Sequence, residues 1–419
     1  MPLTMMKKSP TRVLVLGSGM VGSVIAADLA LDLTLVRTTL AEAKPDARFE
    51  VTIADSSAAA LHVAEQRTRG AAKFVRTDLS DPAQIAMLAT SADIVVNALP
   101  GWLGYRALEQ VITLGKPCCD IAFMPEDAGP LDALAKARNV CAIVDCGVAP
   151  GMSNVFAGLA QLRLPTLDRV SIMVGGLPKH PKPPFMYKAP FSPIDVLEEY
   201  TRPARIKIDG QIVVREALSD IEVFESAELG ALEAFNTDGL RSLLETINAP
   251  TLIEKTMRYP GHAALMAAFR AAGLFEQTPM AVRAAGEGEE KYKGHGELVK
   301  VRPLDVTAKV LFPKWTYEAN EPDATVMRVE AWGKDASFKN VRMQWDLYDE
   351  LDVRTGFPSM SRVTGFACTA MVRMMADDAF SGLAGVFPPE RIVTEDVVLR
   401  LLADMRARNV VYTYRIEEE

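Results

Sequence analysis

Three residues that could bind an anion and move a proton stand close together in the segment KTMRYPGH: Arg258, Tyr259 and His262. A guanidinium can hold a carboxylate through two parallel hydrogen bonds, and an imidazole can take up or release a proton near neutral pH. The Pro-Gly turn between Tyr259 and His262 would display these groups. The alternative for His262 is the common one for a single histidine, a surface position or a hydrogen-bonded place in the core.

Other polar residues stand where chemistry would need them. Asp120 is a carboxylate inside the apolar run KPCCDIAF, and burying it unpaired is costly, so we expect a catalytic role or a buried structural hydrogen bond. Tyr187 lies in the proline-rich loop 179–193, and Thr237 and Asp238 stand in AFNTDG. These three are candidates for substrate binding, with ordinary loop capping as the alternative.

The segment GSGMVG, residues 17–22, has the spacing G-x-G-x-x-G between an apolar strand and a helix. In this context Gly17 permits a tight turn, Gly19 lets a pyrophosphate approach the backbone, and Gly22 lets the helix pack on the strand. The motif therefore predicts a dinucleotide whose phosphates face the N-terminus of the helix.

Two predicted strands could each place the residue that binds the adenosine ribose at their carboxyl end. The strand FEVTIAD ends in Asp55, whose carboxylate would bind the ribose hydroxyls of NAD. The segment LTLVRTT (33–39) contains Arg37 and Thr38, which would favour the 2′-phosphate of NADP. We expect Asp55 and NAD, with an insertion around 31–48, and NADP stays possible.

The segment DCGVAPGMSN, residues 145–154, follows the last apolar run of the N-terminal part. Its glycines would let the backbone come close to a ligand, and we expect Gly147 and Val148 to contact the cofactor. Asn154 is its one side chain expected to reach the substrate, and helix capping is the alternative.

The elements that must position these residues follow two patterns. Apolar strands alternate with helices up to about residue 150, which predicts a Rossmann-type, doubly wound parallel sheet over 10–150. Residues 151–355 predict a second α+β domain with a mixed or antiparallel sheet, including hairpins at 205–216, around Asp-Gly, and at 325–349. A helix at about 360–380 is expected to complete the first domain, and 380–419 should form a helix and a strand.

Composition excludes several classes of protein. The net charge of −8, without a basic patch, argues against nucleic acid or an anionic membrane as a partner, and no apolar run is long enough to span a bilayer. The N-terminus predicts no signal peptide, and five scattered cysteines without a CxxC motif fit buried thiols in a reducing cytoplasm.

Several longer segments resemble the saccharopine dehydrogenase-like family, and within it the lysine 6-dehydrogenases. They are VVNAL (95–99), GVAPGMSN (147–154), VGGLPKHPKPPFMY (174–187), LEEYTRPA (197–204), GALEAFNTDG (230–239) and EKTMRYPGHA (254–263). The resemblance implies a homodimer, no metal, and NAD-dependent oxidative deamination of the terminal amine of L-lysine to 2-aminoadipate 6-semialdehyde and ammonia.

The resulting site prediction has three parts. The residues expected to act in catalysis are His262, Asp120 and Arg258. The residues expected to bind the amino-acid substrate are Tyr187, Thr237, Asp238, Tyr259 and Asn154. The residues expected to bind the cofactor are Gly17, Gly19, Met20, Val21, Gly22, Asp55, Ser56, Asp78, Asn97, Ala98, Leu99, Pro100, Gly147 and Val148.

Two alternatives stay open. A saccharopine or carboxynorspermidine type enzyme would act on a secondary amine and would need further cations, which Lys188, Arg202, Arg205 and Arg241 could supply. A protein that binds the nucleotide without turnover is the other, and the intact motifs argue against it.

Overall fold

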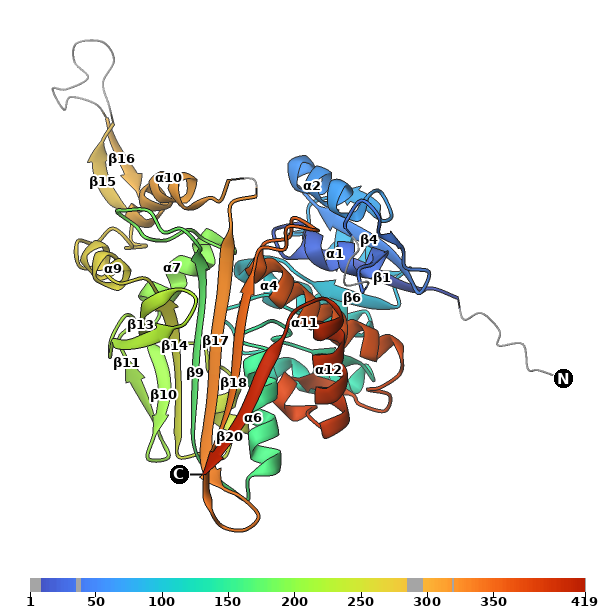
Figure 1. The fold of residues 1–419 in the computed structure, drawn as a ribbon. Helices are drawn as coiled ribbons and strands as arrows, with labels where there is room; N and C mark the ends of the chain where they lie inside the picture. The colour runs from blue at the N-terminus through green and yellow to red at the C-terminus, as the bar shows by residue number, and fades with distance from the viewer. Residues whose placement is uncertain (1–8, 35–38, 285–296, 319, 419) are drawn as a thin grey trace.

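The structure is a computed structural model that describes residues 9–34, 39–284, 297–318 and 320–418. Two large sheets stand side by side, a parallel one at the N-terminal end of the chain and a mixed one built mostly from the later residues (Figure 1). The predicted fold class, a Rossmann-type sheet followed by an α+β domain with a mixed sheet, is therefore confirmed.

The first sheet is parallel throughout, and its apolar strands are buried by helices on both faces. In spatial order its strands are β19 (Gly385–Phe387), β8 (Cys141–Ile143), β7 (Cys118–Asp120), β6 (Ile94–Asn97), β1 (Thr11–Leu16), β4 (Phe49–Asp55) and β5 (Lys73–Arg76). Its helices are α1 (Gly22–Ala30), α2 (Ala58–Thr68), α3 (Pro82–Ala89), α4 (Gly101–Thr113) and α5 (Asp132–Ala137). The strand order reverses between β1 and β6, which is where such sheets bind ligands at their carboxyl ends.

Within the parallel sheet, the strand that follows β1 along the chain is β4, which pairs with β1 and ends at Asp55. The chain between them makes a small antiparallel ladder of β2 (Leu31–Asp32) with β3 (Lys44–Pro45), within the predicted insertion. Arg37 and Thr38, the competing pair, lie outside the described residues. Strand β19 was not predicted; it adds three residues from the C-terminal part to the edge of the sheet beside β8.

The second sheet is mixed because β14 and β9 run parallel while its other ladders are antiparallel. Its main order is β11 (Gln211–Arg215), β10 (Ala204–Ile208), β14 (Thr251–Arg258), β9 (Thr166–Pro178), β17 (Asp323–Lys334), β18 (Asn340–Glu350) and β20 (Tyr412–Glu418), with β12 (Glu222–Ser226) and β13 (Gly230–Asn236) attached to β14 through β13. Both predicted hairpins are confirmed, as β10–β11 and β17–β18.

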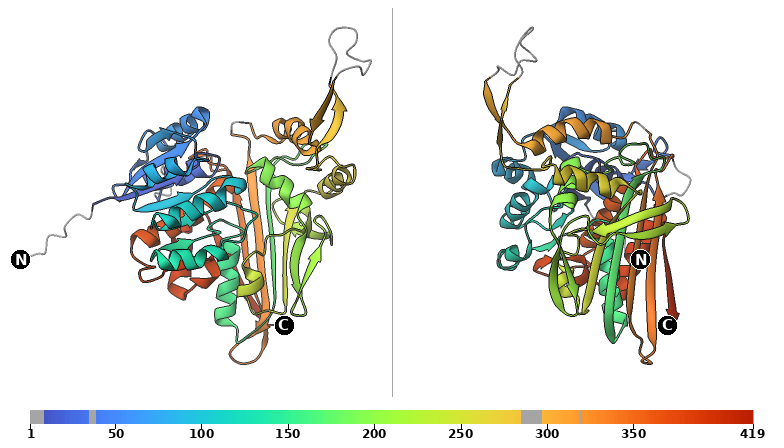
Figure 2. Two further views of the ribbon diagram at one scale, coloured as in Figure 1. Left: turned by 180° about the vertical axis from the view of Figure 1, so that it is seen from behind. Right: turned by 90° about the vertical axis from the view of Figure 1, so that its left-hand side faces the viewer.

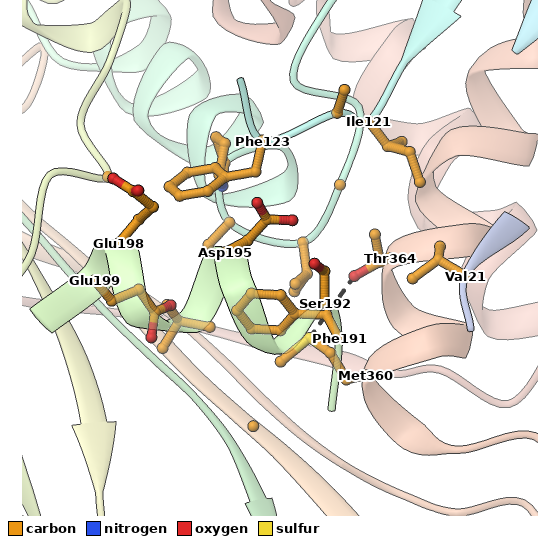
Figure 3. A pocket seen from close by; sticks show the side chains of 18 of the residues that line it. Val21, Ile121, Phe123, Phe191, Ser192, Asp195, Glu198, Glu199, Met360 and Thr364 are labelled. Carbon is orange, nitrogen blue, oxygen red and sulfur yellow. Dashed lines mark hydrogen bonds between the residues drawn. The ribbon is translucent and has the colours of Figure 1, made fainter. Parts of the chain in front are cut away.

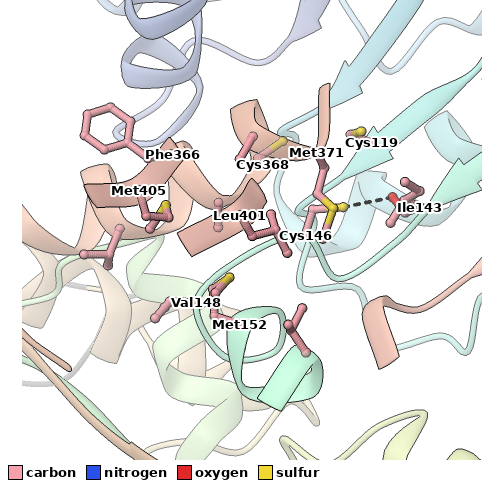
Figure 4. Packing of buried hydrophobic residues seen from close by; sticks show 14 of the residues in the cluster. Cys119, Ile143, Cys146, Val148, Met152, Phe366, Cys368, Met371, Leu401 and Met405 are labelled. Atoms are coloured by element: carbon pink, nitrogen blue, oxygen red, sulfur yellow. Dashed lines mark hydrogen bonds between the residues drawn. The ribbon is translucent and has the colours of Figure 1, made fainter. Parts of the chain in front are cut away.

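Three helices fill the space between the two sheets: α6 (Met152–Arg163), α11 (Ser359–Ala376) and α12 (Glu395–Ala407). Helix α11 packs on α1, where a side chain at Gly365 would come within 3.3 Å of Ile25. Figure 4 shows Cys368 on α11 and Leu401 on α12 in this shared core. All five cysteines are buried and free, as predicted.

The remaining elements belong to the second domain. They are α7 (Pro193–Thr201), α8 (Leu243–Thr246), α9 (His262–Ala271), α10 (Pro303–Trp315) and the projecting hairpin of β15 (Met280–Arg283) and β16 (Leu298–Val301), which Figure 2 shows from two further sides. In the part of the chain that the structure describes, no helix has the length and apolar character needed to cross a membrane.

Candidate functional site

A cavity of about 340 Å³ lies between the two sheets, at the carboxyl edge of the parallel sheet. One wall consists of the glycine turn, the ends of β6 and β7, and the segment 145–150. The opposite wall consists of β9, the start of α7, the segment 237–239 and β14, while Met360 and Thr364 of α11 close one side. The two walls give the cavity a nucleotide half and a second half with different chemistry.

The nucleotide half fits a dinucleotide. A Cβ at Gly17, where φ is +98°, would lie 2.5 Å from the carbonyl oxygen of Ala98, and a Cβ at Gly22 would lie 2.1 Å from that of Gly17. Both glycines are therefore required by the close approach of strand, turn and helix. Nothing lies within 4 Å of the Cβ position of Gly19, so the backbone there is open to a phosphate group.

Asp55 reaches this half from the end of β4. Its Oδ2 accepts a hydrogen bond from the Ser18 amide at 2.7 Å, and its Oδ1 accepts one from the Ser57 amide at 2.8 Å. These bonds fix the carboxylate beside the glycine turn, where the ribose hydroxyls of a bound dinucleotide would need an acceptor.

Most of the residues predicted to bind the cofactor line the cavity: Gly17, Gly19, Met20, Val21, Gly22, Asp55, Ala98, Leu99, Pro100, Gly147 and Val148. The other three do not line it, and their cofactor contacts stay predictions. Ser56 and Asp78 are exposed, and Asp78 accepts hydrogen bonds from Ser80. Asn97 is fully buried.

The amide of Asn97 is used inside the protein together with Asp120. Its Nδ2 donates to Asp120 Oδ2 at 2.6 Å and to the Gly104 carbonyl at 3.0 Å, and Asp120 Oδ1 accepts from the Ala122 amide at 2.7 Å. Burial raises the pKa of Asp120 to about 8. Asp120 does not line the cavity; through Asn97 it joins β6, β7 and α4, and its catalytic role stays a prediction.

The segment 145–154 shapes the cavity with its backbone. Gly147 lines it, but Gly151 does not: a Cβ there would lie 1.8 Å from the Gly147 carbonyl oxygen, so the loop itself requires this glycine. Asn154 Oδ1 accepts from the Gly151 amide at 3.1 Å, and its Nδ2 donates to Glu390 at 3.0 Å. In this structure Asn154 caps its helix, which is the alternative expected for it, and its ligand contact stays a prediction.

The second half of the cavity is built on one face of β14. Side chains alternate along a strand, so Glu254, Thr256 and Arg258 point the same way, and all three line the cavity. Thr237 and Asp238 follow β13 and line it too, where the prediction placed them.

Arg258 lines the cavity but is not free to grip a carboxylate with two N–H groups. Its Nη2 donates to Glu199 and to the Tyr187 hydroxyl, its Nε to the Tyr200 hydroxyl and its Nη1 to the Met257 carbonyl. Four of the five N–H groups of the guanidinium are thus engaged within the protein. The predicted bidentate role is corrected: Arg258 positions Glu199 and two tyrosines.

His262 is buried away from the cavity. Its Nδ1 donates to the Phe185 carbonyl at 2.7 Å, which leaves Nε2 to accept from the Tyr200 hydroxyl at 2.9 Å. Burial lowers the pKa of His262 to about 3, so the ring is neutral near pH 7. In this structure His262 positions Tyr200, which in turn contacts Arg258, and a catalytic role of His262 stays a prediction.

Two tyrosines predicted to bind substrate also lie behind the cavity wall. Tyr187 is buried, and its ring packs against the guanidinium of Arg258, with 4.5 Å between the Arg258 Cζ atom and the ring centre. The hydroxyl of Tyr259 donates to the Pro178 carbonyl at 3.0 Å. Neither lines the cavity, and contact of either tyrosine with a substrate stays a prediction.

Helix α7 supplies site residues that the sequence prediction missed. Asp195, Glu198, Glu199 and Arg202 all line the cavity, and their spacing of three, four and seven residues puts them on one face of a helix. Figure 3 shows Glu198 and Glu199 at one side of the cavity, Val21 and Thr364 at the other, and Asp195 between them. Burial raises the pKa of Asp195 to about 6.

Cations are scarce in this half. The sequence offered four cations for a substrate with additional carboxylates, and of these Arg202 lines the cavity. The other three are paired within the protein: Lys188 with Glu321, Arg205 with Asp238 and Arg241 with Asp145. The guanidinium of Arg202 lies 5.5 Å from the ring centre of Phe123 and contacts Glu198 at 3.4 Å, which leaves donors for a ligand. Within the described residues, no group of three or more His, Cys, Asp and Glu side chains could hold a metal ion.

Comparison with known proteins agrees with this layout. Residues 13–143 match a family model described as the saccharopine dehydrogenase NADP binding domain, and residues 147–411 match one described as the saccharopine dehydrogenase C-terminal domain. The chain is 25% identical over 232 residues to the alpha-aminoadipic semialdehyde synthase of Arabidopsis thaliana, covering 51% of this chain and 21% of that protein.

Two further relatives cover nearly the whole chain. The mitochondrial alpha-aminoadipic semialdehyde synthase of Bos taurus is 19% identical over 96% of this chain and 47% of its own length, so the chain spans less than half of these curated relatives. An apo saccharopine dehydrogenase (L-Glu forming) from Saccharomyces cerevisiae superposes with a TM-score of 0.72 at 17% identity, covering 97% of this chain and all of the other. This likeness shows a shared fold.

Proposed function

Because the chain belongs to the saccharopine dehydrogenase family, we propose that it is a nicotinamide-dinucleotide-dependent oxidoreductase acting at a carbon–nitrogen bond of a lysine-related amino acid. The cavity supports this proposal because a dinucleotide half and a strongly charged half meet in one space of amino-acid size. A bound dinucleotide would accept the hydride, and the chain's own residues supply binding, orientation and charge.

We further propose that the substrate is L-lysine and that its terminal amine is oxidised to give 2-aminoadipate 6-semialdehyde and ammonia. The observation that carries this proposal is the charge of the substrate half. Six carboxylic side chains line it against two guanidinium groups, and one of those, Arg258, is already engaged. The six are Asp195, Glu198, Glu199, Asp238 and Glu254, together with Asp145, which belongs to the opposite wall and pairs with Arg241 just after the segment 237–239.

L-Lysine carries two ammonium groups and one carboxylate, which fits this imbalance. We assign its carboxylate to Arg202, the lining guanidinium with donors still available. Its ammonium groups would then lie among the carboxylic side chains of α7 and β14. For the dinucleotide we propose NAD, because the Asp55 carboxylate would accept hydrogen bonds from ribose hydroxyls and repel a 2′-phosphate.

A second candidate is a saccharopine type enzyme that acts on a secondary amine, as the printed names of the relatives suggest. Saccharopine carries three carboxylates and would need more cations than Arg202 alone. Lys188, Arg205 and Arg241 are each paired with a carboxylate of the protein, which favours lysine over saccharopine.

The two candidates separate in one set of assays. Purified protein is incubated with NAD or NADP and with L-lysine or saccharopine, and formation of reduced cofactor is followed by its absorbance. We expect turnover with L-lysine and NAD. Turnover with saccharopine and none with L-lysine would reject the lysine proposal and keep the family chemistry, whereas tight cofactor binding without turnover on a broad amine panel would reject both.

A further inference from the structure

Glu254 differs from most of the carboxylates that line the substrate half, because no cation of the protein accompanies it. Asp145, Glu198, Glu199 and Asp238 each form an ion pair with an arginine. No ion pair of Glu254 occurs within the described residues. Glu254 is nevertheless buried, with 4% of its surface exposed, and it lines the cavity.

One oxygen of Glu254 is held firmly. Its Oε2 accepts hydrogen bonds from the Thr237 hydroxyl at 2.7 Å and from the Gly239 amide at 3.0 Å, and the Thr237 oxygen also contacts the Thr256 hydroxyl at 2.9 Å. These contacts fix the plane of the carboxyl group while leaving Oε1 available to a ligand.

The surroundings of Glu254 favour an added positive charge. Burial is the main cause that raises its pKa to about 8, and the charged groups that face it, Glu199 of α7 and Asp238 of the loop after β13, raise the pKa further. A buried carboxylate without a cation is costly, so it holds a proton or pairs with a cationic ligand. A substrate ammonium would supply that cation.

The loop after β13 links Glu254 to the carboxyl edge of the parallel sheet. The loop that holds it, 237–239, continues into Arg241, which pairs with Asp145 at 2.9 Å and donates to the Met124 carbonyl at 2.8 Å. Asp145 and Met124 follow strands β8 and β7, at the carboxyl edge of the parallel sheet where a nicotinamide is expected. Glu254 is thus anchored toward that edge.

We propose that Glu254 accepts the proton of the substrate's reacting ammonium group; this inference rests on the proposed function. A proton passes from the ammonium to the Glu254 carboxylate, so an N–H bond breaks and an O–H bond forms. The freed nitrogen lone pair then forms a C=N bond as the neighbouring carbon loses hydride to the oxidised nicotinamide dinucleotide. The amine is oxidised to an iminium ion, the dinucleotide is reduced, and the proton stays on Glu254.

Two measurements on full-length protein test this assignment. The first is the pH profile of kcat for L-lysine in wild type, Glu254→Gln and Glu254→Asp. We expect Glu254→Gln to lower kcat at least about 100-fold and to remove the decrease in kcat that protonation of Glu254 causes as the pH is lowered. Glu254→Asp should recover part of the rate. The matched control is Glu330→Gln, which changes another carboxylate of the mixed sheet that lies outside the cavity and has a raised pKa.

The second measurement does not depend on turnover. Calorimetry of L-lysine binding to protein saturated with reduced dinucleotide, in buffers of different ionisation enthalpy, counts the protons released. Below pH 8, wild type and Glu330→Gln should release up to about one proton per lysine bound, since Glu254 must ionise to pair with the ammonium. Glu254→Gln should release none.

The outcomes separate the two proposals. If wild type oxidises L-lysine and Glu254→Gln keeps both its kcat profile and its proton release, Glu254 is not the acceptor and the proposed function stands. If Glu254→Gln weakens lysine binding but keeps kcat at saturation, Glu254 binds the ammonium without accepting its proton, which also overturns the inference. If wild type oxidises no primary amine, the proposed function falls and the assignment falls with it.

Discussion

A single added methyl group at Gly239 should disable the site without removing any polar group. A Cβ at this position would lie 2.5 Å from Glu254 Cδ, 2.6 Å from Oε2 and 3.0 Å from Oε1. Ordinary contact begins near 3.4 Å, so the carboxyl group must shift by about 0.9 Å. Gly239 has no positive φ that would forbid alanine, so the effect of Gly239→Ala comes from this contact alone.

The size of the effect follows from what the shift breaks. The bond from the Gly239 amide to Glu254 is lost and that from Thr237 is strained, which should lower the free energy of unfolding by about 1–3 kcal/mol. A displacement of about 1 Å in a catalytic group lowers the rate about 100-fold. We therefore expect kcat for L-lysine to fall about 100-fold in a protein that still folds.

Steady-state kinetics with L-lysine and urea unfolding measure both quantities. The control is Gly129→Ala, an exposed position whose Cβ would meet only the Asp127 carboxylate, at 3.4 Å or more. If Gly239→Ala keeps the wild-type kcat, the carboxyl position of Glu254 does not matter to the reaction and the reasoning is refuted.

Three further predictions follow from the same contacts. Arg202→Met should raise the KM for L-lysine at least about 10-fold and leave that for cadaverine, which lacks the carboxylate, nearly unchanged; equal effects in steady-state kinetics would remove Arg202 from the carboxylate site. Glu199→Gln should lower the free energy of unfolding by about 3–5 kcal/mol in urea titrations because it leaves the buried charge of Arg258 unpaired, whereas Glu395→Gln at an exposed pair should change it much less. Asp120 has a pKa of about 8 in the folded protein and one near 4 in the unfolded chain, so its contribution to stability is full below about pH 4 and is lost as the pH rises through 8. Asp120→Asn should therefore reduce the fall in the free energy of unfolding between these pH values, measured by urea titration. An unchanged pH dependence would contradict the raised pKa of Asp120.

The nucleotide half could be predicted from sequence because its signals are local. The glycine spacing at 17–22 and the apolar run ending at Asp55 each lie within one strand–turn–helix unit. Strand β19 could not be predicted in this way, since its three residues join the parallel sheet from more than 240 positions beyond β8.

The substrate half depends on contacts between distant residues. Apart from the Met257 carbonyl, the partners of Arg258 and His262 stand 58 to 77 positions away in the chain, so the sequence alone could not show that these groups are engaged within the protein. The acidic face of α7 is different: the spacing of Asp195, Glu198, Glu199 and Arg202 is visible in the sequence and could have been recognised.

The central claim is that a hydride leaves the terminal carbon of L-lysine for a nicotinamide dinucleotide bound beside Asp55. The most direct measurement uses L-lysine deuterated at carbon 6, with mass spectrometry of the reduced cofactor. We expect one deuterium per reduced NAD and release of 2-aminoadipate 6-semialdehyde with ammonia. Reduced cofactor without deuterium, or deuterium transfer only from saccharopine, would contradict it.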